Sequence, residues 1–103
     1  MSVIQSILNE EVLRLEKNIA QYNKMVLSLP KGSIFIRKIG NSFFVYRKRR
    51  ENGKVVSQYL GNKKSKEAQR QIELSHEYHR ICSNIKVAEK ELKKLRKACK
   101  AYD

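Results

Sequence analysis

The sequence predicts an α+β protein in which an N-terminal helix precedes a three-stranded antiparallel β-meander and a long C-terminal helix follows it. Apolar residues repeat at helical spacing near both ends of the chain, whereas β-branched and aromatic residues dominate three short runs in the middle, separated by glycine-containing turns. A length of 103 residues with 41% hydrophobic residues is enough for one core. We therefore expect residues 1–103 to form a single domain.

The first helix is predicted over residues 3–28. Ser2, followed three positions later by Gln5, resembles a capping box at its start. Pro30 and Gly32 interrupt the helical pattern, because proline lacks a backbone donor and glycine permits turn dihedrals, so the helix should end near Ser28. The apolar residues that define its seam are Ile4, Leu8, Val12, Leu15, Ile19, Tyr22 and Val26.

The meander is predicted over residues 33–60, with strands at 33–39, 42–49 and 54–60. Gly40-Asn41 and Asn52-Gly53 suit two-residue hairpin loops, and with such loops the alternation of side chains defines two faces of the sheet. One face is mainly aliphatic and carries Ile34, Ile36, Phe43, Val45, Val56 and Leu60. The other face mixes rings and cations and carries Phe35, Arg37, Ile39, Phe44, Tyr46, Lys48, Arg50, Val55, Ser57 and Tyr59.

The second helix is predicted over residues 65–102, with Ser65 as N-cap and Glu67 in the first turn. An unbroken heptad seam runs from Leu74 to Tyr102, and two helices with matching seams should pair antiparallel. Because the second helix is longer than the first, part of its seam is left for another partner. Homodimerisation through that part is a hypothesis, and a coiled-coil homodimer that serves in assembly is one alternative function.

The positive charge is concentrated in the middle of the chain. The net charge is +13, and the segment from Lys31 to Lys66 holds eleven lysines and arginines against one acid, Glu51. Such a field attracts polyanions, so DNA or RNA is the expected partner. The predicted nucleic-acid-binding residues are the cations and rings of this segment, namely Lys31, Arg37, Phe44, Tyr46, Arg47, Lys48, Arg49, Arg50, Lys54, Tyr59, Lys63 and Lys64.

Two binding modes fit this segment. Bases of a single strand can stack on the rings of the mixed face while its cations contact phosphates. The basic hairpin at residues 47–50 could instead enter the major groove of a duplex. The structural alternative is that the rings pack beneath a helix and the cations extend into solvent. A further basic stripe on the second helix suits either an ordinary helix surface or contact with phosphates, and consists of Lys86, Lys90, Lys93, Lys94, Arg96, Lys97 and Lys100.

The sequence contains no motif of a catalytic or cofactor site, so we expect no enzyme activity, no catalytic residues and no cofactor. His76, His79 and Cys82 repeat at three-residue steps, but structural zinc usually needs four ligands, and no metal site is predicted. Cys82 and Cys99 would lie ~25 Å apart on one helix, too far for a disulfide. The absence of a long apolar run and of a signal peptide favours a cytoplasmic protein with no membrane partner.

Three segments carry a resemblance: LPKGSI at 29–34, FVYR at 44–47 and GKVVSQYLG at 53–61. Together they resemble small uncharacterised basic proteins of Gram-positive bacteria and their phages, and the last segment alone is similar to the N-terminal part of some insertion-sequence transposases. The resemblance implies a protein of phage or mobile-element type in a bacterial host cell, and together with the charge the sequence predicts a non-enzymatic nucleic-acid-binding protein of that type. The resemblance also implies an alternative, a phage inhibitor of a host defence nuclease, similar to anti-CRISPR proteins, that binds the effector nucleoprotein or its guide RNA.

Overall fold

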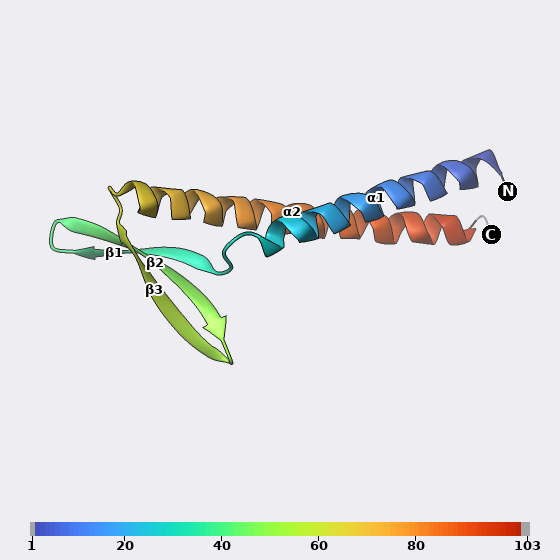
Figure 1. Ribbon diagram of the computed structural model, residues 1–103. Helices are drawn as coiled ribbons and strands as arrows, with labels where there is room; N and C mark the ends of the chain where they lie inside the picture. The colour runs from blue at the N-terminus through green and yellow to red at the C-terminus, as the bar shows by residue number, and fades with distance from the viewer. Residues whose placement is uncertain (1, 102–103) are drawn as a thin grey trace. The chain divides into compact units, whose positions relative to one another are not determined.

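A computed structural model describes residues 2–101 of the chain (Figure 1). The elements in order are α1 (Val3–Leu27), β1 (Ser33–Ile39), β2 (Ser42–Glu51), β3 (Lys54–Asn62) and α2 (Lys66–Ala101). This order confirms the predicted α+β fold. Tyr102, the predicted last residue of the second helix, lies outside the described residues.

The chain divides into two compact units. The first contains the N-terminal segment through Ser28 together with the chain from Arg80 onward, and the second contains residues 29–79. α2 contributes to both, because the boundary falls between His79 and Arg80. None of the helices within residues 2–101 has the length and apolar character that a membrane span requires.

The ends of α1 are set by serine side chains. Ser2 Oγ accepts a hydrogen bond of 3.1 Å from the backbone N–H of Gln5, which satisfies one of the donors that the first turn leaves free. At the other end Ser28 Oγ donates to the carbonyl oxygen of Met25 at 2.7 Å. α1 therefore ends one residue before the predicted Ser28, which is its C-cap.

In the first unit α1 packs antiparallel against the C-terminal part of α2, as the matching seams predict. Leu15 of α1 and Ala88 and Leu92 of α2 form the buried centre. Val12, Ile19 and Leu95 pack against them, Arg96 Nη2 lies 3.0 Å from Glu16 Oε1, and Cys99 Sγ lies 3.6 Å from Asn9 Oδ1. The two chain directions are opposed, because residues later in α2 meet residues earlier in α1.

In the second unit the three strands form the predicted antiparallel meander in the order β1-β2-β3. The first hairpin closes with Ile39 opposite Ser42, and the second closes with Glu51 opposite Lys54. Asn52 and Gly53 have φ values of 50° and 79°, so both central residues of the second turn take the left-handed conformation that the Asn-Gly pair predicts.

A β-bulge in β3 is a feature that the alternation does not predict. Tyr46 pairs with Tyr59 and Val45 pairs with Gly61, so Leu60 is the extra, unpaired residue. After the bulge, β3 pairs with β2 again through Gly61 and Asn62. The strand therefore ends at Asn62, two residues beyond its predicted end. The register on both sides of the bulge keeps the two predicted faces of the sheet distinct.

The first part of α2 covers the aliphatic face of the sheet around Val45 and Arg47, whereas Ile36 and Phe43 on the same face are 44% and 42% exposed. Val45 on this face is fully buried, and Arg47 on the same face is 5% exposed and donates a hydrogen bond of 2.7 Å from Nη2 to Gln71 Oε1. Ala68 and Ser75, on the same part of α2, are buried as well. Because α2 provides the only helical segment of residues 29–79, the mixed face has no helix of its own unit over it.

Candidate nucleic-acid interface

Four rings meet on the face of the sheet opposite to α2, and we call Phe35, Phe44, Tyr46 and Tyr59 the aromatic cluster. Phe35, Tyr46 and Tyr59 occupy directly opposite positions on the three strands, so they form one row across the sheet. Phe44 lies two positions before Tyr46 on the same face. The strand register therefore assembles a continuous aromatic surface from residues up to 24 positions apart in sequence.

The rings of the cluster differ in how much of each ring is already in contact. Phe35 stacks on Tyr46 with centroids 5.1 Å apart and planes inclined by 14°, and Lys48 Nζ lies 5.1 Å from the Phe35 centroid. Tyr59 meets Tyr46 at 5.5 Å and 60° and Phe44 at 6.2 Å and 47°, which are edge or tilted contacts. Tyr59 is also 57% exposed, while the other three are half-buried. Tyr59 is thus the ring most open to a further stacking partner.

Three exposed cations share the face with the aromatic cluster. Arg37 lies opposite Phe44, Lys48 lies opposite Ser57, and Arg50 lies opposite Val55 near the tip of the second hairpin. All three belong to the predicted set of binding residues. Phe35 is absent from the predicted set, although strand alternation places it on this face. Its position directly opposite Tyr46 on the neighbouring strand would have identified it as a candidate.

The basic run at residues 47–50 is divided between the two faces. Lys48 and Arg50 extend on the side of the aromatic cluster, whereas Arg47 and Arg49 lie on the face that α2 covers. Burial, and next the positive charge of Arg49, lower the pKa of the Arg47 guanidinium, which nevertheless stays protonated at neutral pH. The structure therefore places Arg47, a predicted contact residue, inside the unit rather than on its surface.

The other predicted cations on the covered side form two groups. Lys31 and Arg49 line an open hollow of about 500 Å³ at the start of β1, together with Pro30, Gly32, Arg47, Arg50 and Glu51. Lys63 and Lys64 line a second hollow with Phe43, where Lys63 Nζ lies 5.4 Å from the ring centroid. Lys54 is exposed beside the second turn, opposite Glu51.

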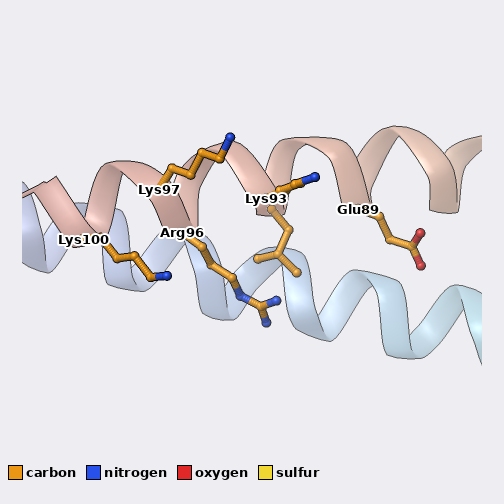
Figure 2. Close-up of a pocket in the computed structure, with 6 residues that line it drawn as sticks. Glu89, Lys93, Arg96, Lys97 and Lys100 are labelled. Carbon is orange, nitrogen blue, oxygen red and sulfur yellow. The ribbon is translucent and has the colours of Figure 1, made fainter.

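The basic stripe of α2 lies in the first unit. Glu89, Lys93, Arg96, Lys97 and Lys100 line a hollow of about 420 Å³. Figure 2 shows their side chains extending from α2. Arg96 is engaged by Glu16 of α1. The remaining cations are exposed side chains on one helix, an arrangement that ordinary solvation of a helix surface also explains.

The histidines and cysteines of α2 do not form a metal centre in the part of the chain that the structure describes. No three histidine, cysteine, aspartate or glutamate side chains of residues 2–101 gather closely enough to hold an ion. The ring of His79 packs edge-on against Tyr78, with centroids 5.4 Å apart. Cys82 and Cys99 are both free thiols.

Comparison with known proteins shows the family of the chain. A family model described as a domain of unknown function, DUF6788, matches residues 5–70, which is more than half of the chain, and the chain belongs to that family. The match includes nearly all of α1, all three strands and the first residues of α2. No curated protein and no solved structure matches the chain.

Proposed function

We propose that this member of the DUF6788 family binds single-stranded nucleic acid, without catalysing a reaction, on the face of its sheet that carries the aromatic cluster. The observation that carries the proposal is the aromatic cluster, four rings from three strands on a face that also presents Arg37, Lys48 and Arg50. Stacking of a base on an aromatic side chain contributes about 1–3 kcal/mol and does not depend strongly on the base. The flanking cations supply contacts to phosphates.

The geometry favours a single strand over a duplex. Paired and stacked bases inside a duplex do not offer their faces to a protein, whereas splayed bases of a single strand do. Tyr59 is the most exposed residue of the aromatic cluster and is the leading stacking residue. The Phe35–Tyr46 stack lies beside it in the same row, with Tyr46 in edge contact with the Tyr59 ring. The cations outside this face, such as Lys54, Lys63 and Lys64, add to the long-range attraction that the net charge of +13 produces.

The resemblance to phage proteins gives the same face a second candidate role. A guide RNA held by a host defence nuclease presents unpaired bases and phosphates, and an inhibitor could bind it with the same rings and cations. In either role the protein acts in the cytoplasm of a bacterial host cell. Capture of a nuclease-treated effector protein from which the RNA has been removed would favour direct binding to the protein over the RNA-binding role.

Fluorescence anisotropy tests the proposal with labelled oligothymidylate, oligouridylate and a duplex of the same length. Single strands should bind more tightly than the duplex at equal salt. The logarithm of the association constant should fall by about 0.7 per logarithmic unit of salt for each phosphate neutralised on a single strand. Binding that does not change between low and high salt contradicts the proposal.

A matched pair of variants tests the role of the aromatic cluster. Tyr59→Ala should weaken binding of the single strand by about 1–3 kcal/mol, and Tyr59→Phe should retain most of the affinity, because the ring remains. Val55→Ala is the control, since Val55 is 59% exposed on the same face and strand but has no ring. Equal affinities of the Tyr59→Ala and Val55→Ala proteins would exclude Tyr59 as a stacking residue.

A further inference from the structure

The segment between α1 and β1 forms one wall of the hollow at Lys31. Pro30, Lys31 and Gly32 face residues of the distal half of β2, and the hollow between them has a volume of about 500 Å³. Four of its seven lining residues are cations, Lys31, Arg47, Arg49 and Arg50, and one is an acid. We call this feature the Lys31 hollow.

The acid in the hollow offsets one of these charges. Glu51 Oε1 lies 3.2 Å from Arg49 Nη2, and both side chains are substantially exposed. An exposed pair of this kind is weak and exchanges readily with other ions. The hollow therefore keeps a strong positive charge even with Glu51 in place.

Arg47 contributes a buried cation, and no carboxylate among residues 2–101 forms an ion pair with it. Its guanidinium donates to Gln71 Oε1, a neutral amide, and Gln71 Nε2 in turn donates to Glu67 Oε1 at 2.9 Å. The nearest negative charge in this series of hydrogen bonds is thus the Glu67 carboxylate, which Gln71 separates from Arg47. Within residues 2–101 no buried side-chain nitrogen or oxygen lacks a hydrogen-bond partner. The hydrogen bond to Gln71 satisfies a donor of Arg47 but does not neutralise its buried positive charge, which an anion in the hollow would offset.

Gly32 allows the two walls of the hollow to approach. Its φ is +108°, and a Cβ on this residue would meet the carbonyl oxygen of Lys48 and lie 3.2 Å from Cβ of Arg49. A larger residue would push the segment away from β2. The glycine therefore lets Lys31 and Arg49 line the same space from opposite sides.

We infer that the Lys31 hollow binds a phosphate group. Arginine and lysine side chains arranged around a small space match the charge and the several acceptor oxygens of that group. The inference rests on the proposed function for the source of the phosphate, which is the backbone of the bound single strand. Arg50 connects the two surfaces, because it lines the hollow and extends from the face of the aromatic cluster.

The first test uses inorganic phosphate as the probe. Amide shifts of Gly32 and Arg49 are followed by NMR as sodium phosphate replaces sodium chloride at constant ionic strength. The shifts should saturate in the wild type and disappear in the Lys31→Ala/Arg49→Ala variant. The control variant, Lys17→Ala/Lys24→Ala, removes the same charge from the exposed surface of α1 and should behave as the wild type. Phosphate and chloride producing the same shifts in the wild type would overturn the inference.

The second test uses the labelled single strands and separates the two proposals. The Lys31→Ala/Arg49→Ala variant, checked for folding by circular dichroism, should lose about tenfold or more in affinity, as expected for hydrogen bonds to a charged group. The slope of the logarithm of its association constant against the logarithm of the salt concentration should become shallower by about 0.7, which corresponds to one lost phosphate contact. The control variant should keep the affinity and the slope of the wild type. Equal affinities of the two variants would overturn the inference while the proposed function stands. Saturable phosphate binding without oligonucleotide binding in the wild type would support the hollow, with free phosphate as its ligand, and overturn the proposed function.

Discussion

Arg47 of β2 donates a hydrogen bond of 2.7 Å to Oε1 of Gln71 in α2, and this contact joins the sheet to the helix that covers it. Arg47 is 5% exposed, and its partner is an uncharged amide. The contact therefore combines a favourable hydrogen bond to a charged group with the cost of burying that charge. The two contributions respond differently to changes of each partner.

Gln71→Ala should lower the free energy of unfolding by about 1–3 kcal/mol, because it leaves the buried guanidinium without this acceptor. Arg47→Met should cost less, since it removes the same hydrogen bond but also removes the buried charge and keeps much of the side-chain volume. Urea unfolding followed by circular dichroism measures both. Gln69→Ala, an exposed change of the same type on α2, should stay within about 0.5 kcal/mol of the wild type. A larger loss for Arg47→Met than for Gln71→Ala contradicts this account.

Gly32→Ala should lower the free energy of unfolding by about 2 kcal/mol or more, because alanine is strained at a φ of +108° and its Cβ meets the Lys48 carbonyl. Gly53→Ala is the matched control. Gly53 has a φ of 79°, but a Cβ there meets nothing within 4 Å, so only the backbone strain of about 1–2 kcal/mol applies. Thermal unfolding of the two variants compares the costs. Equal losses would show that the close approach to Lys48 adds nothing.

Leu92→Ala should lower the free energy of unfolding by about 2–5 kcal/mol, because Leu92 is 8% exposed at the centre of the helix pair. Leu13→Ala, at a position 57% exposed on α1, should change it by less than about 0.5 kcal/mol. Amide hydrogen exchange gives the measurement for each unit. The single domain predicted from the sequence requires the protection of β2 amides to fall together with that of α1 amides. Loss of protection in α1 alone would show that the two compact units unfold separately.

The helix cap and the hairpin turn were predictable from the sequence, because each depends only on residues close together in the chain. Ser2 caps α1 through Gln5, and Asn52-Gly53 closes the second hairpin, because each signal acts over a few residues. The cover of the aliphatic face was harder to predict. Ala68 and Ser75 are buried in α2, but both are small and Ser75 is polar. Ala68 precedes the apolar seam that begins at Leu74, and Ser75 is not one of the seam residues. A helix can approach a sheet closely through such residues without a hydrophobic pattern.

The candidate site shows the same division. Alternation along the strands placed Phe44, Tyr46 and Tyr59 on one face, because successive strand residues point to opposite sides. Alternation also puts Arg47 and Arg49 on the same face as Val45, but it could not show that Arg47 would be buried and Arg49 exposed. The bulge at Leu60 was also absent from the pattern, because one extra residue in a strand is recognised only against its paired partner.

The sequence alone determined that a basic meander lies between two helices and that four of its rings share one face with Arg37, Lys48 and Arg50. Those properties follow from turn chemistry, periodicity and charge, which are local. Only the tertiary structure decided that α2 covers the opposite face, that Phe35 stacks on Tyr46, and that the linker at Gly32 meets β2 to form the Lys31 hollow. Those contacts join residues distant in the chain, and their geometry depends on how the backbone brings the elements together.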